Sequence, residues 1–112
     1  MQDTVILINR EGMGEAPADL QKTLITNYLK LLIDNNLKPY AICFYGEGVK
    51  LTVEGSPVLE ALKVLETRGV SLVVCMTCLK YFNLVDQLRT GVIGGMGDIL
   101  LAQQRAAKVI TL

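Results

Sequence analysis

The chain has 112 residues, which is enough for one domain with a core of its own and too few for two. Its 11 basic and 11 acidic side chains leave no net charge, so the composition gives no sign of a nucleic-acid or anionic membrane partner. The sequence contains no histidine, which excludes Ser-His-Asp and Cys-His hydrolytic sites as well as histidine-based zinc and iron sites.

The chain is more apolar than most soluble proteins, with 51% hydrophobic residues and a mean hydropathy of +0.39. Such a composition fits a sheet that is covered on both faces, or a subunit that hides one face against a partner. No stretch reaches the roughly 18 consecutive apolar residues of a membrane-spanning helix. The first ten residues lack the basic start and cleavage site of a secretory signal. We therefore expect a cytoplasmic protein with reduced thiols.

The first half of the chain alternates between strand and helix signals. Residues 4–9 form a short apolar run rich in β-branched side chains, which predicts a buried strand followed by a loop of glycines and prolines. Apolar residues then recur at helical spacing from a predicted N-cap at Asp19 to Asp34. Residues 39–45 predict a second strand, and residues 46–55 predict a long connection with a short extended piece.

The second half of the chain begins with residues that are typical of helix starts and ends. Ser56 suits an N-cap, Pro57 suits the first helical position, and Gly69 lies where a helix commonly ends. Residues 70–74 then predict a third strand, and a short, broken helical region follows over about residues 77–88.

The remaining segments complete the alternation. Residues 91–93 predict a brief fourth strand, residues 94–97 open a helix that runs to about Gln104, and residues 107–112 form a last strand. Strands that alternate with helices predict an α/β protein with a mainly parallel sheet of about five strands and helices on both faces. We expect one domain over residues 1–112.

Two cysteines follow the third predicted strand. Cys75 lies beyond the carboxyl end of that strand, where parallel sheets gather their sites. If a helix begins directly afterwards, its free N–H groups favour the thiolate form of Cys75, and Cys78 lies about one turn further on. Thr77 would offer a hydroxyl donor. A thiolate that attacks a sulfane sulfur or a disulfide needs no general base, so a protein without histidine can carry out that chemistry.

The residues leave other interpretations of this pair open. Both cysteines can be structural, since free cysteine is among the most buried residue types. A thioredoxin-type dithiol is a rival, although Met76 and Thr77 are unusual residues between its cysteines. Zinc is not expected, because it needs about four ligands and the third cysteine, Cys43, lies inside a predicted strand, where it is most simply a core residue. No cofactor is predicted.

Two glycine-rich loops are predicted at the same edge of the sheet as Cys75. The loop at residues 12–14 follows the first strand, but an Ala-Pro pair replaces the continuation of a dinucleotide fingerprint. The segment at residues 94–97 opens the last helix, and a tight turn explains it better than an anion site. The predicted surroundings of the cysteines are therefore Gly12, Met13, Gly14, Thr77, Gly95 and Met96.

The segments GVSLVVCMTCLKYFNLVDQL and GVIGGMGDILLAQQRAAKVITL resemble the DsrE/DsrF-like family. They are most similar to the C-terminal domain of YedF-type, sulfurtransferase-like selenium metabolism proteins, which shows a strand, Cys-Gly-Thr-Cys-Leu, a short helix and a closing A-KVI-L. Cys75, Thr77 and Cys78 match that motif, and Met76 replaces its glycine. The upstream segment FYGEGVKLTVEGSPVLEALKVLETRGV is also similar, so the resemblance covers almost the whole chain.

The resemblance implies a three-layer α/β/α sandwich, oligomerisation and sulfur-relay chemistry. In relay members a cysteine at the end of the third strand carries a persulfide between proteins, and that position corresponds to Cys75. Cys78 belongs to the variant seen in YedF-like members. Those proteins also carry an N-terminal TusA-like domain that this sequence lacks, so we expect a separate sulfur donor and acceptor, with TusA-like proteins as candidates, and a homo-oligomer.

The leading hypothesis is a cytoplasmic persulfide carrier in sulfur or selenium metabolism, in which the Cys75 thiolate accepts sulfane sulfur and Cys78 resolves it. The alternatives are an oligomeric binding or redox-sensing module without turnover, and a dithiol-disulfide oxidoreductase.

Overall fold

Five strands form one sheet in the computed structural model, which describes residues 1–112. The strands are β1 (Thr4–Ile8), β2 (Ala41–Phe44), β3 (Ser71–Cys75), β4 (Val92–Gly94) and β5 (Lys108–Thr111). Their order across the sheet is β4-β3-β2-β1-β5, and every neighbouring pair is parallel. The sheet predicted from the sequence as mainly parallel is therefore wholly parallel.

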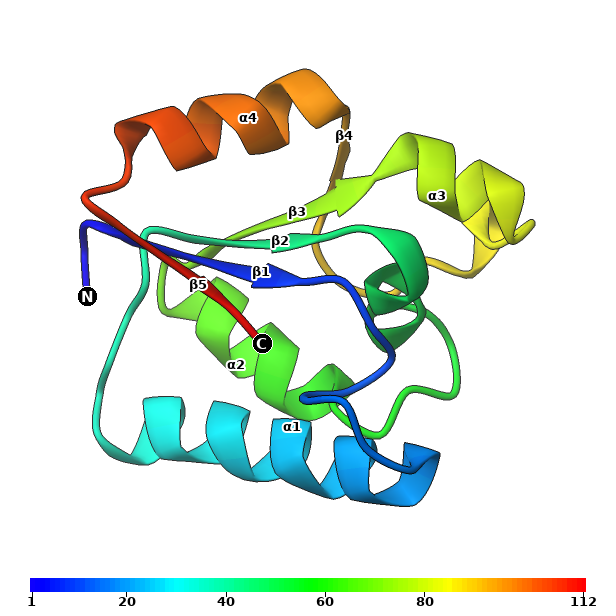
Figure 1. The fold of residues 1–112 in the computed structure, drawn as a ribbon, viewed down its shortest axis with the longest axis horizontal. Helices are drawn as coiled ribbons and strands as arrows, with labels where there is room; N and C mark the ends of the chain where they lie inside the picture. The colour runs from blue at the N-terminus through cyan, green and yellow to red at the C-terminus, as the bar shows by residue number, and fades with distance from the viewer.

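Helices cover both faces of this sheet (Figure 1). The α-helices are α1 (Ala18–Asp34), α2 (Leu59–Thr67), α3 (Met76–Tyr81) and α4 (Met96–Arg105), and the 3-10 helices are η1 (Gly46–Thr52) and η2 (Val85–Gln87). Figure 1 shows α1 and α2 below the sheet and α3 and α4 above it, which confirms the predicted three-layer arrangement. No helix combines the length and the apolar character that crossing a membrane requires.

The core lies along the central strands. Every residue of β1 and β2 is buried, because these strands have a neighbour on each side and a helical layer on each face. Their side chains are mainly branched or aromatic, as in Ile6, Ile42 and Phe44, which are fully buried. The continuous apolar runs seen in the sequence thus reflect burial on both faces.

Two helix starts differ from the sequence-based prediction. Asp19 was the predicted N-cap of α1, but the N-cap is Pro17, two residues earlier, and the helix begins at Ala18. Proline suits this place because its fixed φ matches a helix start. Ser56 was the predicted cap of α2, yet its hydroxyl oxygen accepts a hydrogen bond from the nitrogen of Val58, at 3.2 Å, and the helix begins afterwards.

The connection after β2 is more ordered than the sequence indicated. Residues 46–55 were predicted as a long connection with a short extended piece, but residues 46–52 form η1. A methyl group at Gly48 would overlap the carbonyl oxygen of Ile8, so the glycine lets η1 pack directly against the end of β1. Val49 and Leu51 point into the core and fix the other side of η1.

Candidate functional site

Cys75 lies at the junction between β3 and α3. It is the last residue of the strand and also the residue that precedes the helix, so no loop separates the two elements. This placement at the carboxyl edge of the sheet agrees with the sequence-based expectation. The side chain of Cys75 is only 1% exposed and belongs to the hydrophobic core.

Cys78 lies one helical turn further on and is partly exposed. Its Sγ atom accepts a hydrogen bond from the backbone nitrogen of Gly46, at 3.1 Å. Gly46 has a φ of 56°, in the left-handed region that favours glycine, and the chain turns there from β2 into η1. The contact therefore joins α3 to the segment that follows the neighbouring strand (Figure 1).

The environments of the three thiols differ. Burial raises the pKa of Cys78, the N–H of Gly46 opposes this effect, and the hydrogen bond and charge interaction with Cys75 raise the pKa further. Cys75 and Cys78 are thus close enough to interact. Burial raises the pKa of Cys43 to about 11, and this residue is completely inaccessible. Cys43 is a core residue, as the sequence predicted.

Polar groups that the sequence analysis did not identify lie beside this contact. The amide nitrogen of Asn9, directly after β1, donates to the hydroxyl oxygen of Tyr45, directly after β2, at 3.4 Å. Asn9 Oδ1 and Arg10 Nε are buried and have no hydrogen-bond partner. The signal that could have found Asn9, Tyr45 and Gly46 is their position after parallel strands, the same signal that pointed to Cys75.

A shallow cleft of about 350 Å³ lies between η1 and the chain that follows α3, and neither cysteine lines it. Phe82, directly after α3, and Lys50 of η1 contribute to it, and the Lys50 ammonium lies 4.4 Å from the centre of the Phe82 ring. A hydrogen bond with Glu47 raises the pKa of Lys50. The cleft is lined by Glu11, Lys22, Lys50, Val53, Glu54, Gly55, Ser56, Pro57, Phe82, Leu84 and Gln87.

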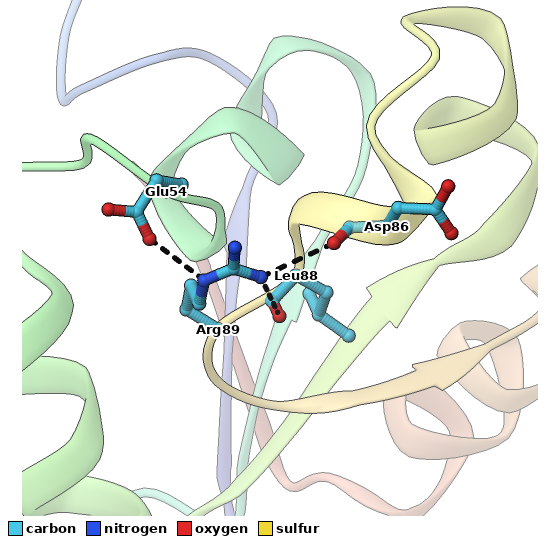
Figure 2. Close-up of polar contacts among 4 residues, drawn as sticks. All are labelled: Glu54, Asp86, Leu88 and Arg89. Atoms are coloured by element: carbon cyan, nitrogen blue, oxygen red, sulfur yellow. Dashed lines mark hydrogen bonds and ion pairs between the residues drawn. The ribbon is translucent and has the colours of Figure 1, made fainter.

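Arg89 joins Glu54, which lines the cleft, to the backbone of Asp86 and Leu88 (Figure 2). Its Nε donates to Glu54 Oε2 at 2.8 Å, and its Nη1 donates to the carbonyl oxygens of Asp86 at 3.3 Å and Leu88 at 3.1 Å. An antiparallel bridge between Val53 and Leu88 runs alongside. These contacts fix the chain that follows η1 to the chain that follows α3, so the elements that carry Gly46 and Cys78 are tied at two places.

The other residues that the sequence placed around the cysteines lie on three different elements. The loop with Gly12, Met13 and Gly14 packs along α1, where the nitrogen of Met13 donates to the carbonyl oxygen of Gln21 at 3.0 Å. Thr77 is exposed on α3. These contacts do not test the roles predicted for the loop and for Thr77, which stay predictions.

Gly95 and Met96 lie at the start of α4, one residue beyond the sheet partner of Cys75. The nitrogen of Gly95 donates to the carboxylate of Asp98 at 2.8 Å, which closes the first turn of the helix. The side chain of Met96 is 56% exposed. The turn predicted at residues 94–97 is present, and its own aspartate satisfies the amide that an anion would otherwise bind.

No cluster of three or more cysteine, aspartate or glutamate side chains is arranged to hold a metal ion. The chemistry that the described arrangement offers is that of two interacting thiols, one of them partly exposed and contacted by a backbone N–H. Such an N–H stabilises a sulfur that carries negative charge, either as a thiolate or as a persulfide anion.

Comparison with known proteins places the chain in one family. The model of the DsrE/DsrF-like family matches residues 4–112. A comparison with curated proteins gives no match. Among solved structures, the chain is similar to the ychN protein from E. coli, with a TM-score of 0.73 and 21% identity over 100% of both chains.

Two further structures share the architecture. The protein MTH1491 from Methanobacterium thermoautotrophicum has a TM-score of 0.71 and 19% identity, with 97% of each chain covered. The protein BT1422 from Bacteroides thetaiotaomicron has a TM-score of 0.65 and 14% identity, over 98% of this chain and 95% of that one. Both are described as proteins of unknown function. At these identities the likeness establishes the fold alone.

Proposed function

The chain belongs to the DsrE/DsrF-like family, and we propose that it is a persulfide carrier in a sulfur relay. The observation that supports this function is the interacting pair Cys75 and Cys78 at the carboxyl edge of the sheet, with the Gly46 N–H directed at one sulfur. Within the family, the motif Cys-Met-Thr-Cys-Leu supports membership of the YedF-type branch and a role in sulfur or selenium metabolism.

We assign the two cysteines by their accessibility. The sequence-based hypothesis made Cys75 the acceptor, but a side chain that is 1% exposed offers no path for attack on a donor. Cys78 is partly exposed and its sulfur has a donor N–H at 3.1 Å. Cys78 is therefore the acceptor in this proposal, and Cys75 is the resolving thiol.

Loading and handover leave the oxidation state of the protein unchanged. The Cys78 thiolate attacks the outer sulfur of a donor persulfide, R–S–SH, and forms Cys78–S–SH while the electron pair of the broken S–S bond leaves with the donor thiolate, R–S⁻. An acceptor thiolate then attacks the outer sulfur of Cys78–S–SH, takes it as a persulfide and releases the Cys78 thiolate. The donor and acceptor in this proposal are other proteins, with TusA-like proteins as candidates.

Cys75 gives the carrier a way to discharge without an acceptor. Its thiolate attacks the inner sulfur of Cys78–S–SH, which forms a Cys75–Cys78 disulfide and expels HS⁻. The sulfane sulfur is reduced to sulfide in this step, and the two cysteines are oxidised. A reducing thiol must then restore the pair. The interaction between the two thiols supports this step, since it places them within reach of each other.

One observation favours a second candidate function. Cys75 is inaccessible, and the raised pKa of Cys78 means that this thiol carries less thiolate than a freely exposed cysteine would. This pattern fits a binding or redox-sensing module in which the cysteines pack or slowly form a disulfide. A binding module would retain its function when both cysteines are replaced by serine, whereas a redox sensor would lose its response.

The exposed apolar surface supports assembly with a second copy of the chain. Val92 of β4 is 67% exposed, and Met96 and Leu100, one turn apart on α4, are 56% and 54% exposed. Groups of exposed apolar residues commonly mark interfaces. The zero net charge means that identical copies do not repel one another, which favours self-association over docking to a charged partner.

The function is tested by loading the protein with sulfur. We would incubate the chain with a cysteine desulfurase and cysteine and measure its intact mass, with Cys75→Ser and Cys78→Ser in parallel and the core variant Cys43→Ala as the matched control. The carrier gains about 32 Da, one sulfur atom, that a reductant removes. The adduct should persist in Cys75→Ser and Cys43→Ala and vanish in Cys78→Ser.

The other outcomes discriminate between the candidates. An adduct that vanishes only in Cys75→Ser would keep the carrier function and restore the assignment made from the sequence. No adduct on either the wild-type protein or Cys75→Ser, with their thiols shown to be reduced before the donor is added, would contradict the carrier function and leave the binding module.

A further inference from the structure

A cavity of about 330 Å³ lies at the amino end of the sheet, away from the thiols. Gln2, Tyr40 and Gly69 lie just before the neighbouring strands β1, β2 and β3, whereas Cys75 ends β3. Figure 1 shows the N-terminus and α3 at opposite ends of the sheet. The function proposed above therefore makes no use of this cavity, which is lined by Gln2, Lys38, Pro39, Tyr40, Arg68 and Gly69.

Both charged side chains that line this cavity are positive. Lys38 and Arg68 form none of the chain's ion pairs, and no carboxylate lines the cavity. An ammonium and a guanidinium group can only donate hydrogen bonds, so both need an acceptor. The chain as a whole has as many acidic as basic side chains, so two cations without a counterion in one cavity favour an anionic ligand.

Contacts within the protein hold the donors of this cavity in place. Arg68 Nη1 donates to the carbonyl oxygen of Ile33 in the last turn of α1, at 3.0 Å, which leaves the other guanidinium N–H groups for a ligand. The hydroxyl oxygen of Tyr40 accepts from Arg105 Nη1 at 3.4 Å, so its own proton is free to be donated. Pro39 is buried and fixes the backbone next to Tyr40. Donors that are already positioned lose less conformational entropy when a ligand binds.

A second cavity, of about 640 Å³, adjoins the first, because Gln2 and Lys38 line both. Its lining combines hydrogen-bonding side chains with two apolar ones and includes the carboxylate of Asp3. Such a lining suits a neutral group that carries hydroxyls, since a hydroxyl can donate to Asp3 and both donate to and accept from Asn36. The residues that line it are Met1, Gln2, Asp3, Asn36, Leu37 and Lys38.

We propose that these two cavities bind a small phosphate monoester with a hydroxylated body, such as a sugar phosphate. The phosphate group lies between Lys38 and Arg68 and accepts a hydrogen bond from the Tyr40 hydroxyl, while the body fills the adjoining cavity. Two positive charges match the charge of about −1.5 to −2 that a phosphate monoester carries at neutral pH, and a guanidinium group fits phosphate oxygens in pairs. The first cavity has the volume of roughly ten waters in the liquid, so a phosphate group alone fills only part of it.

Isothermal titration calorimetry on the full chain tests this site, at about 0.15 M salt so that unspecific charge attraction is screened. Ribose 5-phosphate is the probe, and ribose and inorganic phosphate separate the contributions of its body and its charged group. The variants are Lys38→Gln, Arg68→Gln and Tyr40→Phe. Lys80→Gln is the matched control, because it removes the same charge from an exposed side chain on α3 that lines none of the cavities.

We expect ribose 5-phosphate to bind more tightly than inorganic phosphate, and ribose to show no binding. Lys38→Gln and Arg68→Gln should each weaken the binding of ribose 5-phosphate about tenfold or more, because each removes a hydrogen bond between charged groups, and Tyr40→Phe should weaken it about threefold or more. Lys80→Gln should match the wild type, and so should Cys78→Ser, since the thiols lie at the other end of the sheet. The absence of binding, equal affinities for ribose 5-phosphate and inorganic phosphate, or an equal loss in Lys80→Gln would overturn the proposal.

Discussion

Several opposing effects act on the ionisation of the Cys78 thiol. Burial and the neighbouring Cys75 both disfavour the thiolate, while the N–H of Gly46, at 3.1 Å, favours it. Burial is the largest of these effects, so the pKa of Cys78 is raised overall. A raised pKa lowers the thiolate fraction at neutral pH, but it leaves the thiolate that does form more nucleophilic.

The reaction of Cys78 with iodoacetamide should therefore accelerate with pH beyond the range of an ordinary thiol, whose pKa is about 8.5. The Cys75→Ser variant should shift this profile to lower pH, because it removes the neighbouring group that raises the pKa of Cys78. The rates are measured by peptide mass spectrometry between neutral and alkaline pH. A profile that levels off at or below neutral pH, or one that Cys75→Ser leaves unchanged, would contradict this description.

Cys43 provides an internal control for that experiment. It is completely buried in β2 and its pKa is raised to about 11. Alkylation of Cys43 in the folded protein should therefore remain undetectable while Cys78 reacts. Modification of both residues at equal rates would show that the protein had unfolded.

The element that brings the site together is η1. It follows β2, packs on the end of β1 through Gly48, and places the N–H of Gly46 on α3. The connection carries two glycines in three residues and no clear periodicity, which explains why the sequence indicated only a loop. Local sequence patterns report periodic burial, whereas η1 is specified by its fit against another strand.

The Gly48→Ala variant tests this fit. Its methyl group would overlap the backbone carbonyl of Ile8, which cannot move aside as a flexible side chain would. We expect the free energy of unfolding to fall by about 2–4 kcal/mol, measured by urea denaturation. Gly97→Ala is the matched control, because the added methyl group meets nothing within 4 Å and lies in α4, where alanine is favourable. An equal effect of both substitutions would contradict the role of Gly48.

The Arg89 cluster should contribute modestly to stability. Its partner Glu54 is exposed, and exposed ion pairs are commonly worth less than about 1 kcal/mol. We expect a double-mutant cycle of Arg89→Gln and Glu54→Gln to give a coupling free energy of about 0.5 kcal/mol. A coupling above about 2 kcal/mol would mean that the pair is more shielded from water than the structure indicates.

The parallel sheet is the feature of the whole molecule that the sequence predicts best. Buried parallel strands produce continuous apolar runs, and residues 4–9, 39–45 and 70–74 carried that signal clearly. The position of Cys75 followed from the same pattern, because it depends only on where a strand ends.

The partners of Cys78 could not be predicted in that way. The contact with Gly46 joins residues that are 32 positions apart, and it depends on how η1 packs rather than on local periodicity. The sequence could not predict the burial of Cys75 either, since a cysteine at the end of a strand can face either the core or the solvent. These tertiary effects led us to exchange the roles of the two cysteines.

Assembly is a property of the whole molecule, and the exposed face of β4 and α4 should determine it. Leu100→Glu places a charge in the middle of the exposed apolar group and should convert an oligomer into a monomer, measured by light scattering after gel filtration. Lys63→Glu on the opposite helical layer is the control. A wild-type chain that is already monomeric at high concentration would contradict self-association through this face.

The most direct test of the account is the fate of the sulfur after loading. The wild-type chain and Cys75→Ser would be charged with hydrogen disulfide, freed of excess donor and followed by tandem mass spectrometry together with a sulfide assay. We expect a long-lived persulfide on Cys78 in Cys75→Ser, whereas the wild type should release one sulfide for each Cys75–Cys78 disulfide that it forms. A persulfide located on Cys75, or an adduct on Cys78 that persists equally in both proteins, would contradict the assigned roles.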